Sequence, residues 1–331
     1  YMLSTDIGVD LGTSNVLISV RGKGVVVNQP SVVAYEVSTK KVIAIGTKAK
    51  KMIGKTPENI EVVRPLNKGV ISDYTITEIM LKAFIRSAME KRSGVGRPRI
   101  CVCVPSGVTE VQRRAVEEAV YKTGAKTVYV MEEPLAAAVG ANVDVYEAKG
   151  NMVVDIGGGT TDIAVVSLGG AVESSSIKYA GDDYNNALIK YARRKYNLLI
   201  GDQTAENAKL AIGSVMKREE DVAYDIKGRD LIKGLPKAVT ITANETVDAF
   251  EETTNHILGA IHNVLETAPP ELVSDIAVSG IVLTGGGSLI YGLDKLIKER
   301  TGIDAYISEK ALEAVALGAG MSVNLSDKKD D

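Results

Sequence analysis

The sequence of 331 residues contains no Trp and only two Phe, two Cys and two His. Few residues are therefore available for disulfide bonds or for metal sites built on His and Cys. Two cysteines cannot build a disulfide framework, and the apolar, β-branched run around Cys101 and Cys103 predicts two small buried side chains in a reducing compartment. His256 and His262 lie on one predicted helix, about 240° apart around its axis, and so do not share a ligand. A metal site built on His and Cys is therefore not expected.

Positive and negative charges are nearly balanced: the chain has 39 Lys and Arg and 42 Asp and Glu, which gives a net charge of −3. A nucleic-acid-binding protein usually has a basic excess, and a disordered acidic chain has few aliphatic residues, so we expect neither class and no nucleic-acid partner. No apolar run approaches the roughly 20 residues of a membrane-spanning helix, and no secretory signal is recognised. These absences predict a cytoplasmic globular protein.

What the chain does have is 32 glycines and many Val, Ile, Leu and Ala. Apolar periodicity alternates between strands and helices: strands are predicted over 6–11, 100–104, 127–131 and 280–283, and helices over 77–91, 110–122, 245–267 and 312–323. This alternation is typical of an α/β fold with parallel strands, and the length suggests two domains. The last helix is expected to return to the first domain.

The beginning of the chain is repeated 145 residues later. Residues 152–166 have the layout of residues 7–20, namely a strand that ends in Asp, a turn with glycine and hydroxyl side chains, and a returning strand. Asp155 takes the place of Asp10. The repeat predicts two similar domains that face each other across a cleft.

Three glycine-containing loops predict phosphate binding, because glycine lets backbone N–H groups approach phosphate oxygens closely. Each of the first two loops follows an aspartate, Asp10 or Asp155, that can orient the waters of a bound Mg²⁺. The third loop follows a strand and is predicted to open a helix, whose N-terminus suits an α-phosphate or a nucleoside. One loop alone could be a structural turn, but three in this order indicate a nucleotide site. The candidate ligand-binding residues are Gly12, Thr13, Ser14, Asn15, Gly157, Gly158, Gly159, Thr160, Thr161, Gly285, Gly286, Gly287 and Ser288.

Five segments together resemble the nucleotide-site motifs of the superfamily of actin, sugar kinases and seventy-kilodalton heat-shock chaperones: residues 10–15, 132–140, 155–162, 284–288 and 314–320. Residues 22–33, 64–74, 153–165 and 269–275 extend the resemblance, which then covers essentially the whole chain and is to the MreB family of bacterial actins. The resemblance implies an actin-like α/β ATPase fold with ATP or ADP and Mg²⁺ in a central cleft. It also implies self-association into paired filaments at the cytoplasmic membrane, in a role in cell shape or motility.

The same resemblance divides the chain into two ribonuclease-H-like domains, each with a smaller subdomain. Subdomain IA is expected over 1–29, 65–149 and 313–331, and subdomain IB over 30–64. Subdomain IIA is expected over 150–180 and 245–312, and subdomain IIB over 181–244.

The resemblance also implies roles for single residues. Glu133 matches the glutamate that positions or activates the attacking water, and Thr160 the threonine that helps to place it. Phosphoryl transfer requires mainly positioning and charge neutralisation, so one carboxylate and one hydroxyl suffice for slow hydrolysis. The neighbouring Glu132 is the alternative, and is otherwise interpreted as a carboxylate that stabilises the start of a helix. Glu206 and Lys209 match the pair that contacts adenosine, but could equally be an ordinary ion pair on a helix surface.

The apolar membrane anchor of the family is weak in this sequence. We therefore expect that any attachment to an anionic membrane surface depends on basic side chains, namely Lys91, Arg92, Arg97 and Arg99.

Two other functions are known on the same fold. A sugar or acetate kinase would need a catalytic Asp and larger insertions, whereas this chain has Glu133 and short insertions. A chaperone ATPase would need a peptide-binding domain after Val323. A filament-forming ATPase is the function that the sequence favours, with a small-molecule kinase as the alternative.

Overall fold

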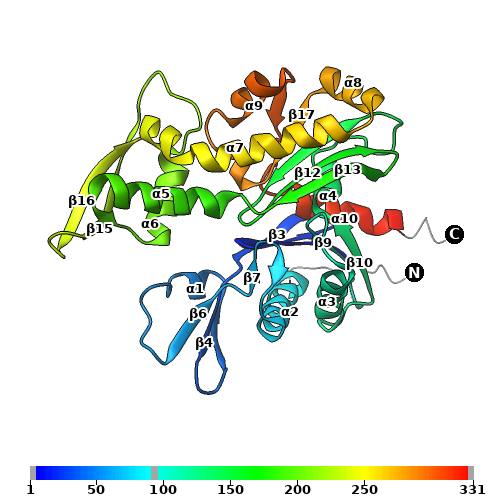
Figure 1. Cartoon of the computed structure of the whole chain (residues 1–331). Helices are drawn as coiled ribbons and strands as arrows, with labels where there is room; N and C mark the ends of the chain where they lie inside the picture. Colours follow the sequence, from blue (N-terminus) through cyan, green and yellow to red (C-terminus); the bar gives the residue numbers. More distant parts are fainter. Residues whose placement is uncertain (1–4, 91–95, 327–331) are drawn as a thin grey trace.

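The structure is a computed structural model that describes residues 5–90 and 96–326 (Figure 1). Its two largest sheets have the same topology. The first has the order β10-β9-β1-β2-β3, and the second has the order β13-β12-β11-β17-β18. In each sheet an antiparallel hairpin begins with a strand that also pairs in parallel with a strand from much later in its domain. The strands are β1 (Asp6–Leu11), β2 (Asn15–Val20), β3 (Gly24–Pro30), β9 (Arg99–Val104), β10 (Thr127–Glu132), β11 (Asn151–Ile156), β12 (Thr161–Ser167), β13 (Gly170–Ile177), β17 (Ile281–Thr284) and β18 (Ala305–Ile307).

The repeat predicted from the sequence is thus present as two similar domains, and aliphatic side chains fill their cores. In the first domain α2 (Tyr74–Glu90) and α3 (Glu110–Tyr121) pack on the sheet, and Phe84 of α2 joins its core. In the second domain α7 (Ala243–Thr267) packs on the sheet, α5 (Gly181–Tyr196) packs against α7, and Phe250 of α7 is fully buried. Both phenylalanines are therefore core residues.

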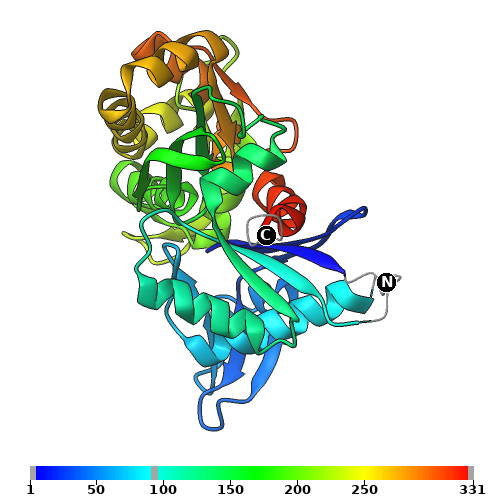
Figure 2. The ribbon, with the colours of Figure 1, turned by 90° about the vertical axis from the view of Figure 1, so that its right-hand side faces the viewer.

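Two helices cross between the domains and pack against each other. The helix α4 (Glu133–Gly140) follows β10 of the first sheet but lies on β11 and β12 of the second. The helix α10 (Ala314–Ser326) follows the second domain and lies on β1 and β9 of the first, as expected (Figure 2). Glycine makes this crossing possible, because a Cβ on Gly318 would lie 1.8 Å from the carbonyl oxygen of Ala136, and a Cβ on Gly140 would lie 1.9 Å from that of Ala314.

Smaller elements are inserted into each domain. They are β4 (Val33–Glu36), β5 (Val42–Ile45), α1 (Thr47–Lys50), β6 (Ile60–Val63), β7 (Leu66–Asn67) and β8 (Val70–Ile71) in the first, and β14 (Leu198–Leu199), α6 (Asp202–Ile212), β15 (Ala223–Asp230), β16 (Pro236–Thr242), α8 (Pro270–Ser279), η1 (Gly286–Leu289) and α9 (Leu293–Thr301) in the second. The division into four subdomains stays a prediction. Among the described residues, no helix combines the length and the apolar content needed to cross a bilayer.

Candidate active site

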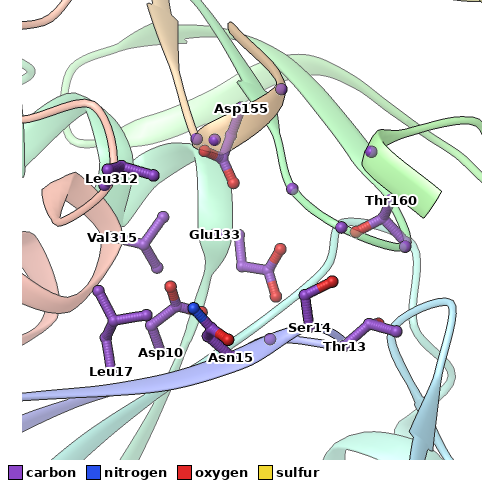
Figure 3. Close-up of a pocket in the computed structure, with 18 of the residues that line it drawn as sticks. Asp10, Thr13, Ser14, Asn15, Leu17, Glu133, Asp155, Thr160, Leu312 and Val315 are labelled. Carbon is purple, nitrogen blue, oxygen red and sulfur yellow. The ribbon is translucent and has the colours of Figure 1, made fainter. Parts of the chain in front are cut away.

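A cavity of about 320 Å³ lies between the two domains, where the three glycine loops meet (Figure 3). The first loop connects β1 to β2, the second connects β11 to β12, and the third follows β17. The predicted residues that line the cavity are Asp10, Gly12, Thr13, Ser14, Asn15, Glu133, Asp155, Gly157, Gly158, Gly159, Thr160, Glu206, Lys209, Gly285, Gly286 and Gly287. The fold therefore brings together residues that the sequence places far apart.

The first two loops approach each other so closely that side chains at two glycine positions of the second loop would collide with the first loop. A Cβ on Gly158 would lie 1.9 Å from Ser14 Oγ, and a Cβ on Gly159 would lie 2.5 Å from Thr13 Oγ1. Because these positions are glycine, backbone N–H groups and hydroxyls of both domains can face one small space. Such a set of donors from two sides suits a polyphosphate.

Three carboxyl groups converge on the same cavity, as Figure 3 shows for Asp10, Glu133 and Asp155. Burial and the nearby charge of Asp155 raise the pKa of Asp10 to about 8. Burial also raises the pKa of Asp155 to about 7, although the Thr284 hydroxyl donates to Asp155 Oδ1 at 2.8 Å. Burial, followed by the charges of other carboxylates, raises the pKa of Glu133 well above its usual range. A nearby cation would stabilise the charged forms of these groups.

The oxygen donors in the cavity fit a Mg²⁺ ion that is bound jointly by the protein and by the phosphates of a ligand. In the part of the chain that the structure describes, no three His, Cys, Asp or Glu side chains are grouped closely enough to hold a metal ion by themselves. Mg²⁺ is usually bound by one or two carboxylates together with waters and substrate phosphates. Asp10 and Asp155 provide such hard oxygen donors directly beside the phosphate-binding loops.

The raised pKa values predict that these carboxyls destabilise the protein without ligands. An unfolded aspartate releases its proton near pH 4, whereas folded Asp10 keeps it up to about pH 8, so its contribution to the free energy of unfolding becomes less favourable as pH rises between these values. In EDTA and without nucleotide, Asp10→Asn is therefore expected to raise the melting temperature at pH 8 by at least about 2 °C, and by less at pH 5. The exposed Asp248→Asn is the control. A melting temperature of Asp10→Asn equal to the wild type at pH 8 would contradict this prediction.

The structure distinguishes Glu133 from Glu132. Glu133 begins α4 and lines the cavity. Glu132 does not line it, makes no capping hydrogen bond to α4, and accepts a hydrogen bond from Ser106 Oγ at 2.9 Å. This placement favours Glu133 as the carboxylate that meets a ligand.

Two predicted ligand-binding residues do not line the cavity. Thr161 is fully buried and donates a hydrogen bond to the carbonyl oxygen of Tyr179 at 2.7 Å. Ser288 Oγ donates to the carbonyl oxygen of Gly285 at 2.6 Å, within the third loop. Both hydroxyls therefore support the backbone of their own domain. Their predicted contact with a ligand is not supported by this geometry.

The third loop opens a helix, as predicted, but this helix is a short 3₁₀ helix. The loop forms a short 3₁₀ turn over Gly286–Leu289, and α9 begins only at Leu293. Consecutive glycines have a low helix propensity, which explains why the turn does not continue as an α-helix. The bare glycine backbone still lies at the cavity wall.

Glu206 and Lys209 both line the cavity from α6, and each is bonded to a different partner. Glu206 forms an ion pair with Lys50 of α1 across the cleft, at 2.9 Å. Lys209 Nζ donates to the carbonyl oxygen of Gly181 at 2.9 Å, and burial lowers its pKa. The two side chains are thus positioned by contacts within the cleft rather than by an isolated surface pair.

An apolar part of the wall was not predicted. Leu210, Leu289 and Leu312 line the cavity and are 73%, 52% and 56% exposed. Three exposed leucines beside a polar, glycine-rich floor suit the flat apolar faces of a nucleobase. No pattern in the sequence marks them, because each belongs to a different element and is an ordinary aliphatic residue.

Arg99, one of the predicted basic membrane contacts, is paired within the first domain. Its Nε and Nη2 donate to Asp6 Oδ1 and Oδ2 at 2.8 and 2.9 Å, and its side chain is 17% exposed. Arg97 donates to the carbonyl oxygens of Gly124 and Ala125 and so also stabilises the first domain. Lys91 and Arg92 lie outside the described residues.

The comparisons with known sequences agree on one family. A family model described as MreB/Mbl protein matches residues 4–331. The chain is 47% identical over 327 residues to the cell shape-determining protein Mbl of Bacillus cereus, with 99% of this chain and 98% of that protein covered. It is also 47% identical over 330 residues to the cell shape-determining protein MreB of Escherichia coli K12, with 98% of this chain and 95% of that protein covered.

Solved structures confirm the actin-like α/β fold. The crystal structure of MreB5 of Spiroplasma citri bound to ADP matches with a TM-score of 0.92 and 38% identity, over 99% of this chain and 98% of that chain. The structure of the same protein bound to AMPPNP matches with a TM-score of 0.93 and 37% identity, over 100% of this chain and 99% of that chain. A MamK double helical filament structure, with a TM-score of 0.81 and 22% identity over 98% of this chain and 99% of that chain, supports the fold alone.

Proposed function

This chain belongs to the MreB/Mbl family of bacterial actins, and from that premise we propose that it binds ATP with Mg²⁺ between its two domains, hydrolyses the ATP slowly and assembles into filaments. One observation carries the catalytic part of the proposal: two repeated glycine loops, each preceded by an aspartate, meet around a cavity that also contains Glu133. The ADP and AMPPNP complexes of MreB5 support the choice of an adenine nucleotide.

Each part of the cavity has a role in this proposal. Backbone N–H groups and hydroxyls of the first two loops bind the β- and γ-phosphates, and Asp10 and Asp155 would hold a hydrated metal ion beside them. A bound Mg²⁺ would neutralise charge on the phosphates. Glu133 orients the attacking water and accepts its proton, while the Thr160 hydroxyl helps to place that water. The leucine-lined part of the wall receives the base.

The metal contact gives a direct test. Asp155→Ala removes a hard oxygen partner of the hydrated metal ion beside the phosphates, so we expect Mg-dependent affinity for ATP to fall about 10- to 100-fold. Isothermal titration with Mg²⁺ and with EDTA separates the metal-dependent part of binding. Asp248→Ala, at an exposed position of α7, is the control. If Asp155→Ala bound ATP as tightly as the wild type in Mg²⁺, the proposed metal site would be wrong.

Assembly is tested by sedimentation and electron microscopy with ATP and Mg²⁺, where filaments are expected. A protein that stayed monomeric at all concentrations would contradict the filament proposal. Phosphate release without any acceptor molecule would distinguish this protein from a small-molecule kinase.

We further propose that the filaments attach to the anionic cytoplasmic membrane and serve cell shape. The names of the Mbl and MreB relatives, which are cell shape-determining proteins, support the role in cell shape. Since Arg99 is paired with Asp6, we expect the attachment to depend on other basic groups. Pelleting with vesicles of increasing anionic lipid content is expected to carry more protein, and less of it at high salt. Pelleting that responds to neither variable would exclude an electrostatic attachment.

A further inference from the structure

A second carboxylate stands beside Asp155 in the second repeat, and the first repeat has no equivalent. The strands β11 and β12 pair with Asp155 directly opposite Asp162, and residues opposite each other in an antiparallel pair have side chains on the same face. In the first repeat Leu17 is opposite Asp10. A hairpin of this kind therefore forms without the second carboxylate, and Asp162 is not needed for the local fold.

The surroundings of Asp162 also argue against a role in stability. Its side chain is 0% exposed. Its Oδ1 accepts a hydrogen bond from the backbone N–H of Ser106 at 2.8 Å. Its Oδ2 has no partner with good hydrogen-bond geometry among the described residues, although the Asp162 carboxyl lies close to the side chains of Thr160 and Glu133. A buried, half-satisfied carboxylate opposite another carboxylate is unfavourable for folding. Such a residue points to a function of the site.

Ser106 connects Asp162 to the helix that carries Glu133. Ser106 follows β9 of the first sheet, so its hydrogen bond to Asp162 crosses to the second domain. Its Oγ donates to Glu132 Oε2 at 2.9 Å, and Glu132 directly precedes Glu133. One residue thus joins the start of α4 to the strand that follows the Thr160 loop.

We propose that Ser106 and Asp162 are positioning residues for hydrolysis, which hold the Glu133 carboxyl in a fixed place relative to the phosphate loop that ends at Thr160. The inference rests on the proposed ATPase function. Neither Ser106 nor Asp162 lines the cavity, so they act through Glu133 and not on the nucleotide. Misplacing a catalytic group by about 1 Å can lower the rate about 100-fold, so a tether of this kind has a measurable effect.

The first experiment separates turnover from affinity. Ser106→Ala removes the bond to Glu132 but keeps the N–H that binds Asp162, and Asp162→Asn keeps an oxygen acceptor but removes the charge. Each is expected to lower single-turnover ATP hydrolysis about 10-fold, with ATP affinity within about twofold of the wild type. Ser106→Thr restores a hydroxyl and is expected to recover most of the rate. Ser167→Ala, at the far end of the same strand β12, is the matched control and should be unchanged.

The second experiment asks whether the effect passes through Glu133. In a Glu133→Gln background, Ser106→Ala is expected to lower the rate by less than about twofold, because there is no longer a carboxylate base to position. The same 10-fold loss in both backgrounds, or parallel losses of affinity and rate, would overturn the inference. So would a wild-type protein that hydrolyses ATP while Ser106→Ala and Asp162→Asn match its rate. A wild-type protein that binds ATP without hydrolysing it overturns the proposed function itself, which is a different result.

Discussion

Replacing Glu133 by Gln is expected to slow phosphate release from ATP about 100-fold or more, with ATP affinity within about threefold of the wild type. Gln fills the same space and keeps hydrogen-bonding atoms, but it cannot accept the proton of the attacking water. Glu133 is 6% exposed and lies at the cavity wall, so bulk water has little access to it and few other groups can accept the proton in its place. A phosphate-release assay and a nucleotide-binding titration measure the two quantities separately.

Two further variants make this prediction specific. Glu266→Gln, at an exposed position of α7, should leave both quantities unchanged. Glu132→Gln keeps an oxygen that can accept the hydrogen bond from Ser106, so its effect should be much smaller than that of Glu133→Gln. If Glu133→Gln hydrolysed ATP at the wild-type rate and Glu132→Gln did not, the catalytic role would belong to Glu132.

Gly318→Ala is expected to destabilise the protein by about 2 kcal/mol or more. Alanine favours a helix interior over glycine by about 1 kcal/mol, so propensity alone predicts the opposite sign. The new Cβ would lie 1.8 Å from the carbonyl oxygen of Ala136 and 2.8 Å from the backbone nitrogen of Gly140. These are backbone atoms that cannot rotate away, so α4 and α10 must move apart and lose contacts between the domains.

The matched control for this prediction is Gly259→Ala in α7. A Cβ there would meet nothing within 4 Å, so the same substitution should stabilise the protein by up to about 1 kcal/mol. Urea unfolding of both variants measures the two free energies. A Gly318→Ala variant as stable as the wild type would show that the two helices are not in the close contact described above.

The elements predicted most accurately are those with strong local patterns. The repeated hairpins and the long helix over 245–267 were found because alternation and helical periodicity extend over many residues. The strand β18 was missed because it has three residues, two of them exposed. The helix α8 was not predicted either, although proline is favoured at the first turn of a helix and α8 starts at Pro270.

Much of the candidate site could also be predicted, because glycine loops and their aspartates are local in sequence. Thr161 does not line the cavity for a geometric reason: it is the first residue of β12 and its hydroxyl bonds to Tyr179, whereas Thr160 still belongs to the loop at the cavity. The link from Asp162 through Ser106 could not be predicted. It depends on how a loop of one sheet meets a strand of another, and tertiary packing alone decides that.

The position of α10 has a consequence for synthesis of the protein. The strands β1 and β2 are synthesised before α10 but pack against it, since Ser19 Oγ donates to the carbonyl oxygen of Ala316 at 2.6 Å and the absence of a side chain at Gly8 leaves space for the same carbonyl. Contacts between residues so distant in sequence form slowly, because a long loop must close first. While the second domain is being translated, one face of the first sheet therefore remains uncovered. The contacts of β1 and β2 are therefore completed only after α10 has been synthesised.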